Sequence, residues 1–164
     1  MTRIDKIAVV GGGAWGTALA LTAARAGRQV ILWARDQGTV SDIRSRQQNP
    51  RYLPGITFDE EMEATTDLGA IKGADAILLV TPAQTTRQIL KSIARYGPVS
   101  VPLVLCAKGI ESSTGELLSE VLRDELPDAK PAMLSGPSFA DDVARGLPTA
   151  VTVAAETREI ADSL

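Results

Sequence analysis

The sequence contains no histidine, a single cysteine and few aromatic residues. Without histidine the chain cannot form a Ser-His or Cys-His catalytic pair, and it cannot bind zinc through histidine. We therefore expect no metal site, and any proton transfer must use Lys, Asp, Glu or Tyr side chains or a group from elsewhere. The cysteine, Cys106, ends the apolar run Pro102-Leu103-Val104-Leu105-Cys106, which indicates a buried and unreactive core thiol.

Basic stripes and long apolar runs are also missing. The formal net charge is −3, and aromatic residues make up 4% of the chain. A nucleic-acid-binding domain usually carries a basic stripe or stacking aromatic side chains, so we expect no nucleic-acid partner. The apolar runs fall far below the roughly 18 residues of a membrane span, and the first residues have no apolar signal core. With no internal disulfide possible, these features indicate a cytoplasmic protein without a membrane span.

Short aliphatic runs alternate with helix-like stretches along the whole chain. We predict strands at 6–10, 29–33, 63–66, 75–81, 103–107, 132–135 and 148–154, and helices at 14–26, 36–48, 67–72, 82–96, 116–126, 138–144 and from 156 onward. Strands separated by helices indicate an α/β fold, a Rossmann-type doubly wound and mostly parallel sheet with helices on both faces. In such sheets, ligands bind at the edge where the strands end.

Four helix ends carry recognisable signals. Gly27 is expected to end the first helix as a C-terminal glycine, and Asn49 before Pro50 is expected to end the second. Pro82 is expected to open the helix that runs to residue 96, since proline costs little at a helix start. Ser138 is expected to cap the helix at 138–144.

The glycine-rich turn Gly11-Gly12-Gly13-Ala14-Trp15-Gly16 fits the G-x-G-x-x-G pattern. It follows a predicted buried strand and opens a predicted helix, which is the context that a dinucleotide-binding fingerprint requires. The first glycine of the pattern permits the tight turn, the second lets the backbone approach a pyrophosphate, and the third lets the helix lie close to the strand. The free N–H groups and the positive helix end would then bind the phosphates, which predicts NAD(P) as cofactor. Trp15 is either a half-exposed apolar residue or a cofactor contact.

The end of the second predicted strand bears on the choice between NAD and NADP. An NAD-specific domain usually has an acidic residue here, which holds the ribose 2′-hydroxyl. This chain has Arg35, which can stack on adenine and clamp a 2′-phosphate with its planar guanidinium. Asp36 could still serve the hydroxyl, and a solvated surface arginine is the other interpretation of Arg35. NADP is therefore favoured, and NAD stays an alternative.

Three later strand ends, at 81–83, 106–111 and 135–140, reach the same edge of the predicted sheet. Lys108 stands beside a glycine at one of them, where an ammonium group can stabilise charge on a carbonyl or hydroxyl oxygen. A surface lysine is the alternative interpretation. Gly136 and Ser138 open a predicted helix, and they either bind an oxygen anion or form a simple cap.

Five motifs occur in order along the chain. They are Gly11-Gly-Gly-Ala-Trp-Gly-Thr-Ala-Leu-Ala20, Asn49-Pro-Arg-Tyr-Leu-Pro-Gly55, Ala107-Lys-Gly-Ile-Glu111, Ser135-Gly-Pro-Ser-Phe-Ala140 and Gly146-Leu-Pro-Thr-Ala150. With these motifs the chain closely resembles the bacterial NAD(P)-dependent glycerol-3-phosphate dehydrogenases over essentially its whole length. Enzymes of this family interconvert dihydroxyacetone phosphate and sn-glycerol 3-phosphate, which feeds phospholipid synthesis.

The resemblance implies roles for the residues that match family motifs. Lys108 touches both cofactor and substrate and is the expected catalytic residue of this chain, acting as an electrophile, while Gly136 and Ser138 touch the substrate. With the glycine turn, the expected cofactor-binding residues are Gly11, Gly13, Ala14, Trp15, Gly16, Arg35, Lys108 and Ala140.

The family also has a second, helical domain, which carries the lysine taken to be the proton donor and residues that bind the substrate phosphate. We expect this chain to comprise an NAD(P)-binding domain at 1–155 and the start of a truncated helix at 156–164, without the second domain. The isolated chain is therefore expected to be inactive. A homodimer is expected only for the full-length enzyme.

Two alternatives stay open. One is another two-domain dehydrogenase with the same layout, such as a relative of 6-phosphogluconate dehydrogenase, against which the loop Lys108-Gly-Ile-Glu111 argues. The other is a free-standing NAD(P)-binding module that senses nucleotide or regulates a partner. Only the missing second domain supports this alternative.

Overall fold

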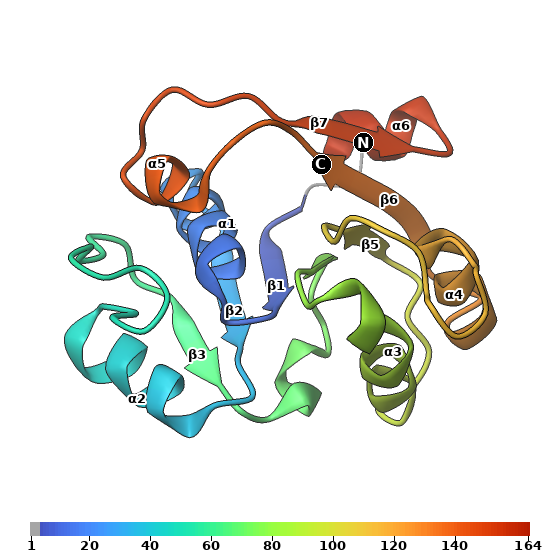
Figure 1. Ribbon diagram of the computed structural model, residues 1–164, viewed down its shortest axis with the longest axis horizontal. Coiled ribbons are helices and arrows are strands. Elements are labelled where there is room, and N and C mark those ends of the chain that lie inside the picture. The colour runs from blue at the N-terminus through green and yellow to red at the C-terminus, as the bar shows by residue number, and fades with distance from the viewer. Residues whose placement is uncertain (1–3) are drawn as a thin grey trace.

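The computed structural model describes residues 4–164, which form a seven-stranded sheet (Figure 1). The strands are β1 (Lys6–Val10), β2 (Gln29–Trp33), β3 (Glu63–Thr65), β4 (Ala76–Leu79), β5 (Pro102–Leu105), β6 (Lys130–Ser135) and β7 (Thr152–Ala155). Their order in the sheet is β3-β2-β1-β4-β5-β6-β7, with β1 to β6 parallel and β7 antiparallel to β6. The prediction of a doubly wound, mostly parallel α/β sheet is confirmed.

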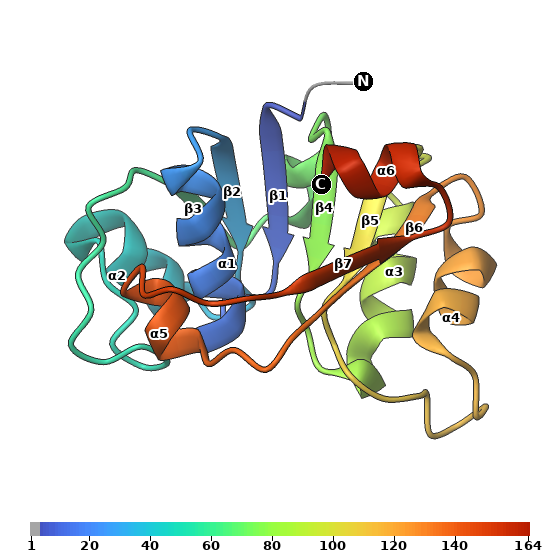
Figure 2. The same ribbon diagram turned by 90° about the horizontal axis from the view of Figure 1, so that it is seen from above.

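The strand order reverses at the centre of the sheet. The chain runs outward from β1 to β2 and β3 and then returns to place β4 on the other side of β1. Figure 2 shows the arrowheads of β1, β2 and β4 pointing the same way, so the segments that follow these strands leave from one edge. Figure 1 looks onto that edge. A reversal of this kind opens a crevice beyond the strand ends, where ligands bind in open α/β sheets.

Helices cover both faces of the sheet. Most buried apolar residues of α1 (Ala14–Arg25), and those of α2 (Gln37–Arg46) and α5 (Ala140–Ala144), belong to one hydrophobic cluster. Those of η1 (Leu68–Ile71), α3 (Thr86–Ala94) and α4 (Leu118–Glu125) belong to the cluster on the opposite face. The short 3-10 helix η2 (Ala83–Thr85) precedes α3, and α6 (Arg158–Ser163) follows β7.

The central strands are buried on both faces, because successive side chains of a strand point to opposite sides of the sheet. In β1, Val9 joins the cluster formed with α1 and α2, whereas Ala8 and Val10 join the cluster formed with α3 and α4. This double burial explains why the strands show as continuous apolar runs rather than as alternating patterns. Cys106 lies in a third, smaller cluster, next to Leu19 of α1.

Three of the four predicted helix ends need correction. Gly27 ends α1 as expected, with a φ of +74°. The second helix stops earlier than Asn49, because Gln47 already adopts the left-handed conformation at φ 51°. Pro82 caps the short η2 rather than one long helix. Ser138 caps nothing: α5 begins at Ala140, two residues later than expected, and its N-cap position makes no side-chain hydrogen bond.

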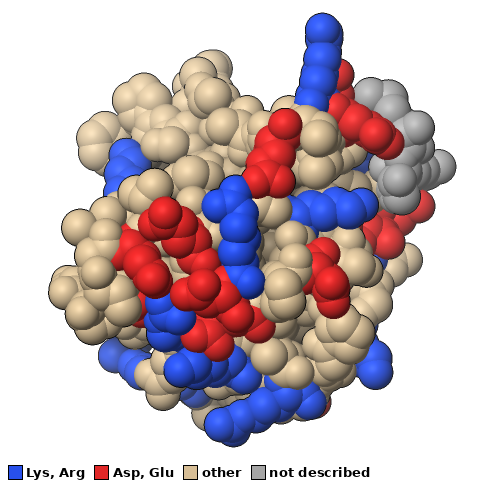
Figure 3. Space-filling model, turned by 90° about the vertical axis from the view of Figure 1, so that its right-hand side faces the viewer, with Lys and Arg blue, Asp and Glu red and all other residues tan. Residues whose placement is uncertain are grey.

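Acidic and basic side chains gather on the face of the molecule that α4 helps to form (Figure 3). The network there joins Arg87 of α3 to carboxylates of α4 and of the loop that precedes it.

Within residues 4–164, none of the helices has the length and apolar character that a membrane-spanning helix needs.

Candidate functional site

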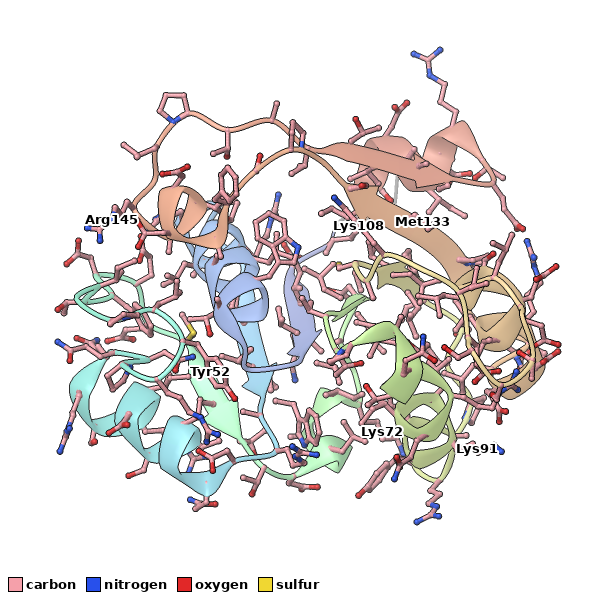
Figure 4. The ribbon with its side chains drawn as sticks, in the orientation of Figure 1. Tyr52, Lys72, Lys91, Lys108, Met133 and Arg145 are labelled. Carbon is pink, nitrogen blue, oxygen red and sulfur yellow. The ribbon has the colours of Figure 1, made fainter. Side chains whose placement is uncertain are left out.

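The edge where the parallel strands end collects the residues singled out in the sequence. Residues 11–16 follow β1, Arg35 follows β2, Lys108 follows β5 and Gly136 follows β6. Because these strands are parallel neighbours, the segments after them lie on one side of the sheet. In Figure 4, which shares this view, Lys108 lies between α1 and β6.

The glycine turn is too tightly packed for side chains at two of its positions. Gly11 has a φ of +133°, and its N–H donates to the carbonyl oxygen of Trp33 at 2.9 Å. A Cβ on Gly11 would lie 2.8 Å from the carbonyl oxygen of Val80. A Cβ on Gly16 would lie 1.8 Å from the carbonyl oxygen of Gly11, so only glycine lets α1 start this close to the turn.

Gly13 is different, because a Cβ there would meet no other atom within 4 Å. It occupies the N-cap position of α1 with extended backbone, it makes no side-chain cap, and the first turn contains no acidic residue. The first N–H groups of a helix have no acceptor within the helix, and they carry the positive end of the helix dipole. The turn therefore presents free donors next to open space, which fits a dinucleotide pyrophosphate.

Trp15 and Ala14 stand in the first turn of α1, and both are partly buried. Trp15 packs against the hydrophobic clusters on the α1 face of the sheet. The sequence left open whether Trp15 is a half-exposed apolar residue or a cofactor contact. Its partial burial at the mouth of the turn is compatible with both.

Asn49 fastens a distant loop to the glycine turn. Its fully buried amide nitrogen donates to the carbonyl oxygen of Gly12 at 3.0 Å and to the hydroxyl oxygen of Thr17 at 2.8 Å. The sequence predicts Asn49 as the end of a helix and does not reveal this contact. The signal that could have found it is the position of Asn49 in a family motif.

The corner beyond β2 is basic at its surface. Arg35 is exposed, two residues beyond the last residue of β2. The neighbouring Asp36 caps α2 and accepts from the backbone N–H of Thr39 at 2.8 Å and from its hydroxyl at 2.9 Å. These hydrogen bonds hold the pKa of the Asp36 carboxyl below its usual range. The guanidinium of Arg51 lies 3.6 Å from the other oxygen of Asp36, and it stacks over Tyr52, which Figure 4 labels.

Lys108 is exposed, and among residues 4–164 its side chain makes no hydrogen bond or ion pair. The backbone at the next residue is constrained, since Gly109 has a φ of +120°. Just before it, Cys106 is buried, and this burial raises the pKa of its thiol to about 12. The loop thus offers one free ammonium group, while the thiol stays protonated at neutral pH.

The segment after β6 is held against the strand that returns to it. A Cβ on Gly136 would lie 2.7 Å from the carbonyl oxygen of Ala150. The hydroxyl of Ser138 donates to the same oxygen at 2.8 Å, which is why it is not free to cap a helix. Ala140 begins α5 and packs with the cluster around α1.

Arg25 of α1 fixes the far end of α5. Its guanidinium donates to the carbonyl oxygens of Val143 at 2.9 Å and Ala144 at 2.5 Å, and it pairs with Glu60 at 2.6 Å. The two carbonyls belong to the last turn of α5, where a positive charge is favourable. This arrangement was not visible in the sequence, because Arg25 and α5 are more than 100 residues apart.

A hollow of about 610 Å³ lies elsewhere, beside β2 and β3. Its lining includes Lys6 and Gln29, the first residues of β1 and β2. It therefore opens near the edge where the strands begin, opposite the glycine turn. It brings none of the predicted site residues together.

The comparisons with known proteins agree on one family. The family described as NAD-dependent glycerol-3-phosphate dehydrogenase N-terminus matches residues 6–161. The chain is 52% identical to the glycerol-3-phosphate dehydrogenase [NAD(P)+] of Rhodopseudomonas palustris over 100% of the chain and 50% of that protein. It is 56% identical to the protein of the same name from Brucella melitensis biotype 1 over 97% of the chain and 49% of that protein.

Solved structures give the same picture. The glycerol-3-phosphate dehydrogenase of Coxiella burnetii superimposes with a TM-score of 0.88 at 35% identity, and the match covers 98% of this chain and 49% of that one. The chain thus spans about half the length of the relatives that it matches.

Proposed function

The chain belongs to the NAD-dependent glycerol-3-phosphate dehydrogenase family, and we propose that it is the NAD(P)-binding half of an enzyme that interconverts dihydroxyacetone phosphate and sn-glycerol 3-phosphate. The observation that carries this proposal is the pairing of two features on one edge of the sheet. One is the uncapped start of α1 at the open Gly13, and the other is the unpaired ammonium of Lys108.

The cofactor would lie across the strand ends. Backbone N–H groups at Gly13, Ala14 and Trp15 would hold the pyrophosphate, and the close packing of Gly11 and Gly16 keeps these groups in place. When bound, the reduced nicotinamide supplies a hydride to the C2 carbonyl carbon of dihydroxyacetone phosphate.

Lys108 would act on the carbonyl oxygen. Negative charge builds on that oxygen as the hydride arrives, and an ammonium group fixed nearby stabilises it. The absence of histidine leaves this chain no imidazole for the task. The oxygen must finally receive a proton. We propose that a group outside this chain donates it.

Substrate contacts are proposed at Gly136 and Ser138, and a further cofactor contact at Ala140. The hydroxyl of Ser138 already donates to Ala150, so its lone pairs are the part of it that can accept from a substrate hydroxyl. Arg25 holds α5 in place, which fixes Ala140 relative to α1.

NADP is the proposed preference. Asp36 is occupied by Thr39 and lies near Arg51, so it is poorly placed to accept from a ribose 2′-hydroxyl. Arg35 is exposed beside it and can bind a 2′-phosphate. The alternative function, a free-standing nucleotide sensor, predicts that the protein binds the cofactor without turning over dihydroxyacetone phosphate.

The test has two parts. NADPH titrated into the chain and followed by nicotinamide fluorescence should show saturable binding. The complete enzyme should oxidise NADPH, seen as a loss of its absorbance, when dihydroxyacetone phosphate is added. Binding by the complete enzyme without any turnover of this substrate would contradict the proposal and favour the sensor.

A further inference from the structure

The loop that follows Lys108 is folded around one buried carboxylate. Ile110 forms an isolated β-bridge with Leu117, and the backbone N–H of Glu111 donates to the backbone carbonyl oxygen of Glu116 at 2.9 Å. The N–H of Gly115 donates back to the carbonyl oxygen of Glu111 at 2.8 Å. The side chain of Glu111 lies inside this closed loop, and the residue is only 6% exposed.

Arg87 of α3 holds that carboxylate. Its Nε lies 3.0 Å from both oxygens of Glu111, and one terminal nitrogen lies 2.9 Å from Oε2. The hydroxyl of Thr114 adds a hydrogen bond of 2.7 Å. The hydrogen bond from Arg87 is the main reason why the pKa of Glu111 lies below its usual range. A buried carboxylate needs such a partner, because an unpaired charge there is costly.

The same guanidinium reaches three more carboxylates. It contacts Glu116 at 2.5 Å, Glu125 at 2.8 Å and Asp124 at 3.3 Å. Arg87 thus ties the loop to α4 as well as to α3. It also binds acids that stand close to Lys108 along the chain, and the ammonium of Lys108 remains unpaired among the described residues.

Gln84 of η2 makes a second attachment. Its amide nitrogen donates to the carbonyl oxygen of Ile110 at 2.8 Å, and its amide oxygen accepts from the N–H of Ser112 at 2.9 Å. Gly109 passes beside Ala83, since a Cβ on it would lie 3.8 Å from the Cβ of Ala83. The segment after β4 therefore holds the segment after β5 at two points.

We propose that Arg87 and Gln84 are positioning residues for Lys108, acting together as a latch that fixes the loop at 109–117 so that the ammonium group stands free at the strand ends. The role in the reaction rests on the proposed function, whereas the latch itself does not. Neither Arg87 nor Gln84 needs to touch cofactor or substrate. Both act through the backbone on which Lys108 is mounted.

The first test measures how firmly the loop is held and does not depend on enzymatic activity. Amide hydrogen exchange of the chain should show the loop at 109–117 exchanging about tenfold faster in Arg87→Met and in Gln84→Leu, while the glycine turn at 11–16 is unchanged. Arg123→Met is the matched control, because it removes an arginine of α4 that pairs with Glu156 and not with the loop. Unchanged exchange of the loop in both latch variants would overturn the proposal.

The second test is a double-mutant cycle in the complete enzyme. Arg87→Met should lower kcat/KM for dihydroxyacetone phosphate by about 10–100-fold, because a misplacement of about 1 Å can cost that much. Arg87→Lys should recover part of the loss. In a Lys108→Ala background, Arg87→Met should change kcat/KM by less than about twofold, since the group being positioned is gone. Losses that multiply in the double variant would show that Arg87 acts independently of Lys108, which overturns the positioning role.

The two tests separate this proposal from the proposed function. A wild-type enzyme that does not reduce dihydroxyacetone phosphate refutes the proposed function, and the exchange measurement still decides whether the latch exists. A melting temperature recorded for every variant gives a further control. The lowering caused by Arg87→Met should be the same with and without Lys108, so a loss of stability cannot imitate the coupling.

Discussion

At the scale of single residues, the three glycines of the fingerprint differ in what surrounds them. Gly11 combines a φ of +133° with close contact to Val80, and Gly16 lies against the carbonyl of Gly11. Gly13 has ordinary extended backbone and open space where its Cβ would be. Two of the glycines are therefore needed by the fold, whereas the packing around the third leaves room for a side chain.

This difference predicts opposite outcomes for two substitutions. Gly13→Val should leave the melting temperature within about 2 °C of the wild type but abolish NADPH binding, because its side chain occupies the space that a phosphate would take. Gly16→Ala should lower the melting temperature strongly, because the new methyl would lie 1.8 Å from a backbone oxygen. Thermal unfolding and nicotinamide fluorescence measure the two effects. Normal NADPH binding by Gly13→Val would mean that the pyrophosphate lies elsewhere.

Arg35 allows a prediction about cofactor choice. A charge-assisted hydrogen bond is worth roughly 1.5–3 kcal/mol, so Arg35→Ala should weaken NADPH binding by about tenfold to a hundredfold. NADH carries no 2′-phosphate, so its affinity should change much less. Titrating both cofactors against both proteins checks this. An equal loss for both would mean that Arg35 stacks on adenine and ignores the 2′-phosphate.

The site residues that the sequence predicted belong to local patterns, and those it missed depend on distant partners. The positions of Gly11, Gly13 and Gly16 follow from one motif between a strand and a helix. The contact of Asn49 with Gly12 joins residues that are 37 positions apart, and no periodic pattern in the sequence indicates it. Arg25 and α5 are farther apart still, so only the folded chain reveals why α5 lies where it does.

At the scale of elements, the strands were easier to predict than the helix ends. A strand buried on both faces must be apolar throughout, and β1 and β2 have the predicted bounds for that reason. Helix ends depend on competing local hydrogen bonds. Ser138 has a residue type suited to a cap, but its hydroxyl donates a hydrogen bond to the carbonyl oxygen of Ala150, which lies just before β7. The exposed Phe139 fills the N-cap position instead.

Asp75 joins two central strands and gives a prediction for pH dependence. Its carboxylate accepts from the backbone N–H groups of Asp5 at 2.9 Å and Lys6 at 2.8 Å, which aligns the start of β1 with β4. These two hydrogen bonds lower the pKa of the Asp75 carboxyl, and the bond from Lys6 has the larger effect. Asp75→Ala should lower the melting temperature at pH 7 by about 3–6 °C, from the loss of about 1.5 kcal/mol.

The sign of the pH effect follows from that lowered pKa. The carboxylate contributes its full stabilisation above the pKa of the unfolded chain, near 3.8, and loses it as the pH falls through the lower pKa of the folded chain. The difference in melting temperature between the wild type and Asp75→Ala should thus be constant from pH 7 to pH 5 and shrink below about pH 4. A difference that persists unchanged at pH 2 would assign the effect to packing.

At the scale of the whole molecule, the fold places the residues proposed for cofactor binding and those proposed for chemistry on two kinds of segment. The first βαβ unit provides the glycine turn and Arg35, and the later strand ends provide Lys108 and the segment at 136–140. Parallel strands bring both groups to one edge although they are far apart in the sequence. Composition and strand alternation were sufficient to predict this architecture. The contacts of the proposed latch were not predictable, because they join side chains of η2 and α3 to a loop.

The last prediction is that the 164-residue chain binds NADPH but does not turn over dihydroxyacetone phosphate. The substrate is small and doubly charged, so its phosphate must be anchored to hold C2 against the nicotinamide. Such orientation can account for roughly 7–11 kcal/mol of barrier lowering. In the part of the chain that the structure describes, every arginine after β5 is paired with a carboxylate: Arg123 with Glu156, Arg145 with Asp141 and Arg158 with Asp162.

We therefore expect the phosphate anchor to come from outside this chain, and we expect Lys108 to matter to the reaction only when that part is present. In the complete enzyme, Lys108→Ala should lower kcat/KM by about a hundredfold or more, because charge on the carbonyl oxygen loses its fixed ammonium group. The affinity for NADPH should change much less, since the glycine turn is untouched. NADPH absorbance and fluorescence measure the two quantities in the same samples. Turnover by the 164-residue chain, or full activity of the complete Lys108→Ala enzyme, would refute the corresponding half of this argument.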